Sequence, residues 1–98
     1  MFEIKDKTGR TIRLTKERWK HIVNSHPIIS NNIEEIKKTL QGPLLITKDE
    51  YDKQVYFYYK FYKNFKDKKT FLIIVVKYLN GSGFIITSFY TDKIVGMK

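Results

Sequence analysis

Two long apolar segments near the C-terminus, residues 70–79 and 83–91, are joined by only three residues, Asn-Gly-Ser. Both segments are rich in β-branched and aromatic side chains, which suit the half-buried surface of a strand. Because so short a link returns the chain alongside itself, the two segments are predicted to form an antiparallel hairpin. Residues 44–47 and 54–62 have a similar composition and short connections. The second half of the chain therefore predicts a four-stranded antiparallel sheet.

The start of the chain carries signals for one hairpin and one helix. Residues 2–5 and 11–14 flank a glycine-containing turn, as expected for two short paired strands. Thr15 then stands at an N-cap position, and apolar residues recur at helical spacing until about Ser25. Pro27 is expected to end this helix because proline cannot continue the backbone hydrogen bonding.

A second helix is expected over residues 30–40. Ser30 can cap its start, and Gly42 followed by Pro43 is a typical stop signal. Helices that precede a run of strands indicate an α+β fold. We therefore expect a single α+β domain over residues 1–98, with an N-terminal β-hairpin, two short helices and then a four-stranded antiparallel sheet.

The charge of the chain indicates a polyanionic partner. Its 98 residues carry a formal net charge of +9, and residues 51–98 hold 13 of the 15 aromatic side chains with nine lysines against three aspartates. No apolar run reaches the roughly 18 residues that a membrane span needs, and residues 1–14 show no signal-peptide pattern. We therefore expect a cytoplasmic protein without a membrane partner. The absence of cysteine excludes disulfides and thiolate zinc sites.

Lys77 is the one charged residue inside the apolar segment 70–79. Burying an ammonium group costs several kcal/mol unless it is paired or reaches the surface, so Lys77 is either such a case or part of a site. If residues 81–82 formed the hairpin turn, Lys77 would share a face of the sheet with Ser88 and Tyr90. Thr87 would then point to the other face.

The preceding strand is unusually rich in tyrosine. Side chains alternate along a strand, so one face would carry aromatic rings together with Lys60. Such a face could stack RNA bases while lysines follow the phosphates. The alternative is structural, since tyrosine is a good strand former and is often half-buried. The residues on that face are Tyr56, Tyr58, Lys60 and Tyr62, and those on the other are Val55, Phe57, Tyr59 and Phe61.

The two histidines are the other candidates. His21 lies off the apolar stripe of its helix, beside Arg18, where an imidazole and a guanidinium could bind a phosphate or exchange a proton. A solvated surface histidine is the alternative. His26 follows the helix and precedes Pro27, where it could simply cap the helix. We expect no metal site, because two histidines five residues apart do not share a helical face and no nearby carboxylate completes a ligand pattern.

Several short motifs follow one another in a fixed order. They are Glu17-Arg18-Trp19-Lys20-His21-Ile22, His26-Pro27, Ile36 to Leu40, Pro43, Tyr58-Tyr59-Lys60, Val75-Val76-Lys77, Gly83-Phe84-Ile85-Ile86-Thr87-Ser88-Phe89 and Thr91-Asp92-Lys93-Ile94. In this order, over about residues 14–94, they resemble the phage barnase/EndoU/colicin/RelE-like nuclease family. Phe89 departs from the family pattern, which often has a tyrosine there.

The resemblance implies a small metal-independent endoribonuclease of the kind found in toxin and phage settings, with no cofactor. RNA would be cleaved by attack of its own 2′-hydroxyl, which needs a base, an acid and cations. Our hypothesis gives acid and base roles to His21 and His26, with Lys77, Thr87 and Ser88 completing the catalytic set. The residues expected to contact RNA are Arg18, Tyr58, Tyr59, Lys60, Lys63 and Tyr90.

Two alternatives remain open from the sequence. The basic, aromatic sheet could bind single-stranded nucleic acid without cutting it. A RelE/ParE-like toxin that acts on the ribosome or on gyrase would share the coarse architecture. If the protein is a toxin, an acidic antitoxin or immunity protein is the expected partner, because complementary charge speeds association.

Overall fold

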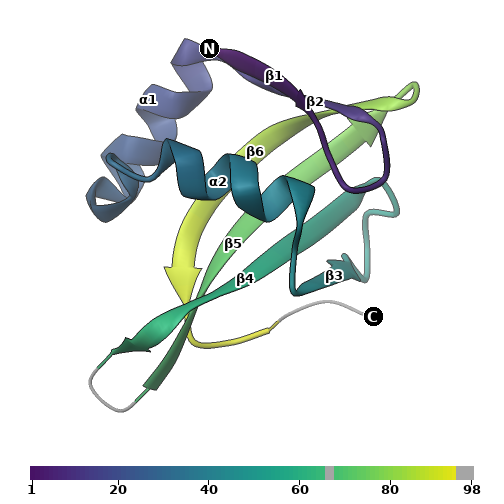
Figure 1. Ribbon diagram of the computed structural model, residues 1–98. Coiled ribbons are helices and arrows are strands. Elements are labelled where there is room, and N and C mark those ends of the chain that lie inside the picture. Colours follow the sequence, from purple (N-terminus) through teal and green to yellow (C-terminus); the bar gives the residue numbers. More distant parts are fainter. Residues whose placement is uncertain (66–67, 95–98) are drawn as a thin grey trace.

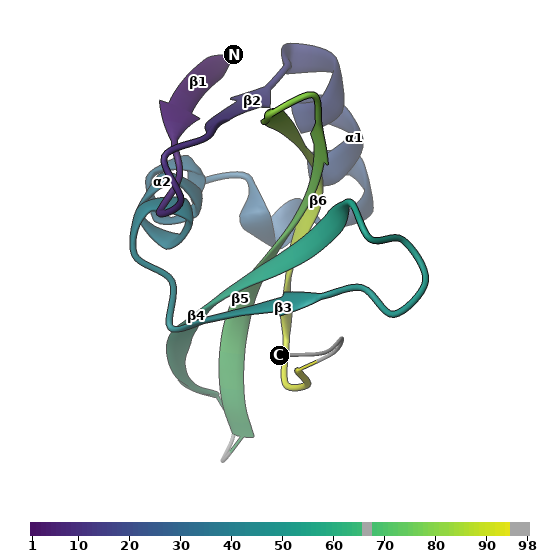
Figure 2. The same cartoon turned by 90° about the vertical axis from the view of Figure 1, so that its right-hand side faces the viewer.

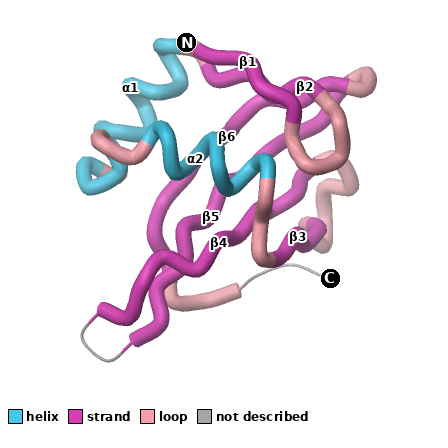
Figure 3. Tube along the Cα trace, viewed as in Figure 1, coloured by secondary structure: helices cyan, strands magenta, loops and turns pink. Residues whose placement is uncertain are grey.

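One mixed sheet with helices packed on it organises the protein in the computed structural model (Figures 1 and 3). The structure describes the backbone of residues 1–65 and 68–94, and the side chains of residues 1–62 and 70–94. The α+β class and the two expected helices are confirmed, but the second helix begins at Ile33 with Asn32, and not Ser30, at its N-cap. The elements in chain order are β1 (Phe2–Lys5), β2 (Thr11–Leu14), α1 (Lys16–Ser25), the 3₁₀ helix η1 (Pro27–Ile29), α2 (Ile33–Gln41), β3 (Leu45–Lys48), β4 (Val55–Phe65), β5 (Lys68–Leu79) and β6 (Ser82–Thr91).

The sheet has six strands in the order β1-β2-β6-β5-β4-β3. The expected hairpin β1–β2 forms, and β3 to β6 pair antiparallel. The hairpin and the four strands belong to the same sheet. The prediction of a four-stranded sheet is wrong because β2 adds parallel to β6 through Ile12–Gly83 and Arg13–Phe84. Gly83 permits this approach, since a Cβ there would lie 2.8 Å from Ile12 Cδ1 and 2.9 Å from Tyr78 Cδ1.

The β5–β6 hairpin turns one residue earlier than the sequence predicts. Leu79 pairs with Ser82, so Asn80 and Gly81 form the turn, with φ angles of 54° and 84°. Two successive positive φ angles are typical of a type I′ turn, and Asn-Gly is its preferred sequence.

A β-bulge in β6 then changes which side chains share a face. Val75 pairs with Thr87 but Val76 pairs with Ile85, which leaves Ile86 as an extra residue. An extra residue moves every later side chain of the strand to the opposite face. The expectation that Lys77, Ser88 and Tyr90 share a face is therefore wrong. Ser88 pairs with Ile74, and Tyr90 with Leu72, on the face away from Lys77, whereas Thr87 lies on the same face as Lys77.

Both helices pack against one face of the sheet and enclose the main core (Figure 2). Tyr58 is fully buried in this core, although it was expected on an open surface for stacking bases. The face that carries Tyr56, Tyr58 and Lys60 is thus the helix side of the sheet. The buried residues of the core are Ile12, Leu14, Ile22, Ile29, Ile36, Leu40, Tyr58, Leu72, Ile74, Val76, Tyr78 and Ile85.

A smaller apolar cluster lies on the other face, which we call the outer face. Tyr59 and Ile73 are almost fully buried there, next to Val55 and Val75. The RNA contact predicted for Tyr59 does not fit its full burial. Partly buried hydrophobic residues surround the cluster: Leu45, Phe57, Phe71, Ile86 and Phe89.

A buried polar network fixes the β1–β2 turn to the core. The Asp6 carboxylate, 6% exposed, accepts hydrogen bonds from the Thr8 N–H at 2.8 Å and the Tyr58 hydroxyl at 3.0 Å. Tyr78 donates to the same carboxylate, and the Arg10 guanidinium lies 3.4 Å from the centre of the Tyr78 ring. Burial alone would raise the pKa of Asp6, but the hydrogen bonds outweigh it and hold this pKa below its usual value. Burial raises the pKa of Tyr58 to about 12.

No helix in the described part of the chain is both long enough and apolar enough to cross a membrane.

Candidate nucleic-acid interface between α1 and β6

A hollow of about 270 Å³ opens where β2 leaves β6 and the chain turns into α1. The two strands pair in parallel over only two residue pairs before they diverge. Diverging parallel neighbours leave a crevice that side chains can line, which is where α/β proteins often place ligands. The residues that line the hollow are Arg13, Thr15, Arg18, Phe84 and Ile85.

Two arginines give the hollow its charge. Arg13 projects away from the core because its neighbours Ile12 and Leu14 are buried in it. Arg18 comes from the first turn of α1, and its backbone N–H donates to Thr15 Oγ1 at 3.1 Å. Among the residues that the structure describes, neither guanidinium has a hydrogen bond or an ion pair, and both side chains are exposed. Unpaired guanidinium groups suit a phosphate, which they can bind through two parallel hydrogen bonds.

Phe84 provides an aromatic surface in the same hollow. It pairs with Arg13 on one side and with Lys77 on the other, so it lies on the outer face. Phe84 is half-buried, yet it belongs to neither of the apolar clusters that the described residues form. Its ring is therefore not required to fill either core.

The histidines lie further along α1, which runs beside β6 (Figure 1). His21 is exposed and follows Arg18 by three residues, so the two side chains share a flank of the helix. The other predicted role of His21, a solvated surface histidine, fits its exposure equally well.

His26 ends α1 and lies against β6. Its backbone N–H donates to the Ile22 carbonyl at 2.8 Å, which closes the last turn. Its half-buried ring stacks on Phe89 with the ring centres 5.2 Å apart and the planes 28° apart. Thr87, half-buried, lies two residues before Phe89 on the outer face. The ring of His26 is thus held in place by Phe89, in addition to the capping of the helix by its backbone N–H.

The hollow and His26 mark the two ends of the α1–β6 junction. Phe84 and Phe89 pair with Lys77 and Ile73, which are four residues apart on β5, so the two rings are separated by about 13 Å along the sheet. Arg18 lies at the hollow, and His21 follows it by one turn on the same flank of α1. We call this strip of surface the α1–β6 junction and define it by Arg13, Thr15, Arg18, His21, His26, Phe84, Thr87 and Phe89.

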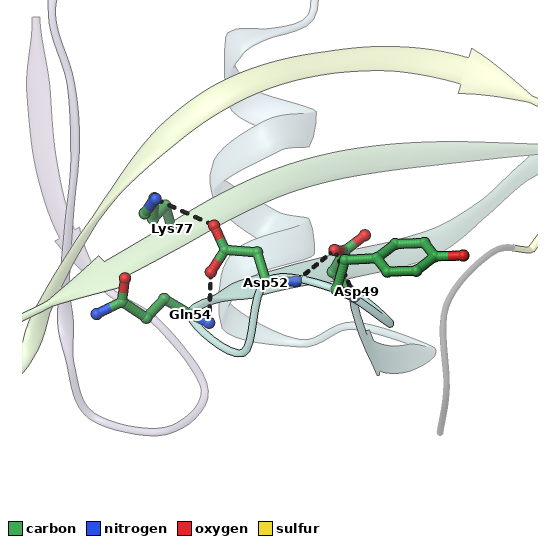
Figure 4. A network of polar contacts seen from close by, with 5 residues as sticks. Asp49, Asp52, Gln54 and Lys77 are labelled. Atoms are coloured by element: carbon green, nitrogen blue, oxygen red, sulfur yellow. Dashed lines mark hydrogen bonds and ion pairs between the residues drawn. The ribbon is translucent and has the colours of Figure 1, made fainter.

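Lys77 does not join the histidines. Its ammonium forms an ion pair with Asp52 Oδ2 at 3.1 Å (Figure 4). The Asp52 carboxylate also accepts the Gln54 N–H at 2.9 Å, and Asp49 accepts the Asp52 N–H at 2.8 Å. The Gln54 N–H, followed by the hydrogen bond from Lys77, lowers the pKa of Asp52. The half-buried ammonium is thus paired, and it lies across from Phe84, at the end of β6 away from His26.

Ser88 is also placed away from the junction. Its side chain is fully buried on the helix face, and its hydroxyl donates to the Ile73 carbonyl at 2.8 Å. The catalytic role predicted for Ser88 does not fit this position, because no substrate can reach a hydroxyl that is enclosed in the core.

The remaining predicted RNA contacts lie on the helix side or outside the described side chains. Tyr90 is half-buried, accepts a hydrogen bond from Asn32, and has its ring centre 4.7 Å from that of Tyr62. Burial raises the pKa of Tyr90. Lys60 is half-buried on the same face. Lys63 belongs to β4, but its side chain lies outside the part of the chain that the structure describes.

Sequence reasoning missed Arg13, Thr15 as a lining residue, and Phe84. A signal for Arg13 was present, since it is the outward residue of a short alternating strand just before the cap of α1. What the sequence pattern lacked was the parallel pairing that brings Arg13 beside Phe84.

No group of three histidine, aspartate or glutamate side chains within the described ranges is arranged to hold a metal ion. Comparison of the chain with protein families, curated proteins and solved structures finds no significant match. The nuclease resemblance of the short motifs therefore remains a prediction.

Proposed function

We propose that the protein is a metal-independent endoribonuclease whose site is the α1–β6 junction. The observation that carries the proposal is that His26, the C-cap of α1, stacks on Phe89 of β6, while the same helix carries His21 and begins at a hollow with two unpaired arginines. Acid, base and phosphate-binding groups thus occur along one strip of surface. The order of two helices followed by four antiparallel strands, β3 to β6, also agrees with the nuclease family that the motifs resemble.

The chemistry needs only side chains of the junction. One imidazole takes the proton of the 2′-hydroxyl while the 2′-oxygen forms a bond to phosphorus. The bond from phosphorus to the 5′-oxygen breaks, and the other imidazole, in its protonated form, gives that oxygen a proton. Thr87 can donate a hydrogen bond to the phosphate, and Arg18 attracts the RNA chain to the junction through its charge. The products are a 2′,3′-cyclic phosphate and a free 5′-hydroxyl.

Incubation of the purified protein with end-labelled RNA in excess EDTA tests the proposal. We expect cleavage with 2′,3′-cyclic phosphate ends, and loss of cleavage in His26→Ala and His21→Ala. Asn24→Ala is the matched control, because Asn24 is also an exposed polar residue of α1. Intact RNA after long incubation, or full activity in both histidine variants, would overturn the assignment.

A second function, RNA binding without cleavage, is favoured by the positions of Lys77 and Ser88. Two of the five groups expected to catalyse the reaction are engaged elsewhere, one in an ion pair and one in the core. A binding protein needs only the cations and an aromatic surface. This function predicts affinity that falls steeply with salt while the RNA stays intact.

A further inference from the structure

The hollow at the start of α1 has the composition of a nucleotide subsite. It combines two exposed guanidinium groups, one hydroxyl and one aromatic ring within about 270 Å³. Because the Arg18 N–H donates to Thr15 Oγ1, the hydroxyl hydrogen of Thr15 remains available to a ligand oxygen. Cations and a hydroxyl donor on one side and a π-face on the other match the phosphate and the base of one nucleotide.

We propose that this hollow binds one nucleotide of single-stranded RNA, with its phosphate between Arg13 and Arg18 and its base on Phe84. This inference rests on the proposed function, and it adds the substrate class to that function. A base can reach Phe84 only if it is unstacked from its neighbours, which is easy in a single strand and costly in a duplex. The hollow therefore selects single-stranded segments.

The position of the hollow also sets a minimum length for the substrate. Phe84 and Phe89 are separated by about 13 Å along β6, so the nucleotide in the hollow is not the one next to His26. The six backbone bonds of one nucleotide are too short to span this distance, even in an extended single strand. A chain that occupies both positions must be an oligonucleotide, and a dinucleotide should be a poor substrate.

Binding can be measured apart from cleavage with a fluorescein-labelled 2′-O-methyl RNA decamer, which lacks the attacking hydroxyl. Fluorescence anisotropy should show that Arg13→Met weakens binding about tenfold at low salt and reduces the slope of log K against log salt by about 0.7, the value for one phosphate contact of a single strand. Arg13→Lys keeps the charge but loses the two-pronged geometry, so its affinity should lie between those of the wild type and Arg13→Met.

Lys20→Met is the matched control for charge. Lys20 is exposed on α1 and is two residues from Arg18, so it projects from the opposite flank of the helix. We expect it to change affinity less than twofold. Equal losses in Arg13→Met and Lys20→Met would mean that only general charge attraction acts, and would overturn the subsite.

The stacking part has its own test. Phe84→Leu should weaken decamer binding roughly fivefold or more, as expected when one stacked base loses its ring. An abasic position that weakens the wild type but not Phe84→Leu would identify the stacked base. If every abasic decamer binds like the intact one, stacking on Phe84 is refuted. Thermal melting of each variant checks that it folds, and Arg13→Met, at an exposed position, gives the result if Phe84→Leu does not fold.

The two proposals fail in different ways. If cleavable RNA stays intact while Arg13→Met still weakens decamer binding more than Lys20→Met, the ribonuclease function falls and the subsite stands. If His26→Ala abolishes cleavage but Arg13→Met and Lys20→Met bind the decamer equally, the ribonuclease function is supported and the nucleotide subsite is refuted. If the wild type neither binds nor cleaves the RNA, both are wrong.

Discussion

The polar groups around Asp6 and those of the α1–β6 junction differ in what they bind. The Asp6 carboxylate is buried and is saturated by hydrogen bonds from Thr8, Arg10, Tyr58 and Tyr78. In the junction, two arginines and one histidine are exposed, and the guanidinium groups have no partner among the described residues. Saturated polar groups stabilise a fold, whereas unsatisfied ones on an accessible surface are free to bind a ligand.

The other buried polar side chains are satisfied in the same way as Asp6. Within the described residues, no buried side-chain nitrogen or oxygen atom lacks a hydrogen-bond partner. Every buried polar side chain there is thus satisfied by the fold. This comparison predicts that substitutions in the two regions will separate stability from RNA binding.

The largest effect is expected for His26→Ala on cleavage. Removal of a general acid or base typically costs 10²- to 10⁴-fold in rate, so cleavage should fall by at least about 100-fold. The melting temperature should fall only slightly, because the ring is half-buried and stacks on one neighbour, Phe89. Single-turnover cleavage rates and thermal melting measure the two effects. If the variant lost activity because it unfolded, His26 would have a structural role, and the contrast between the Asp6 network and the junction would not hold.

Asp6→Asn should have the opposite signature. The substitution replaces charge-assisted hydrogen bonds with neutral ones and introduces donors where the tyrosine hydroxyls already donate, at a cost of about 2 kcal/mol in the free energy of unfolding. Urea denaturation measures this loss. The affinity for the 2′-O-methyl decamer should be unchanged under conditions where the variant is folded. A folded variant with weakened binding would show that the two regions are coupled.

The stability should also depend on acid through Asp6. Its pKa is lowered in the folded state, so its contribution is present above the unfolded pKa of about 4 and is lost as the pH falls through the folded value. Asp52, whose pKa is also lowered, acts in the same direction. Urea denaturation between about pH 2 and pH 6 should show a shallower pH dependence in Asp6→Asn than in the wild type. Identical slopes would contradict the role of Asp6.

The smallest effect is expected for Lys77→Met. The Lys77–Asp52 pair is partly exposed, and water screens such pairs, so its loss should change the free energy of unfolding little. Cleavage by the variant should remain within about twofold of the wild type, since Lys77 lies at the end of β6 away from His26. A large loss of activity would return Lys77 to the catalytic set and extend the site across the outer face onto β5.

Local sequence signals predicted the elements well. Thr15 as N-cap and Pro27 as terminator both describe α1 as it is found. The strand segments also form, because alternation and turn residues act over a few positions. These are the properties that neighbouring residues determine among themselves.

The errors come from contacts between distant parts of the chain. The parallel pairing of Ile12 with Gly83 joins residues more than 70 positions apart, and no local pattern encodes it. The extra residue Ile86 in β6 carries no distinctive signal, yet it moves Ser88 from the outer face to the core. The histidines were found as candidates because their residue type is informative, whereas Arg13 depended on the unforeseen pairing.

The early separation of β2 from β6 has a consequence for how the protein can change over evolution. The crevice left by that separation is lined by Arg13, Arg18 and Phe84, none of which fills an apolar cluster. Replacing them should alter which ligands are recognised at little cost to folding. Substitutions at the connection between the β1–β2 hairpin and α1 can thus change ligand specificity during evolution, while Gly83, which permits the pairing of β2 with β6, is kept.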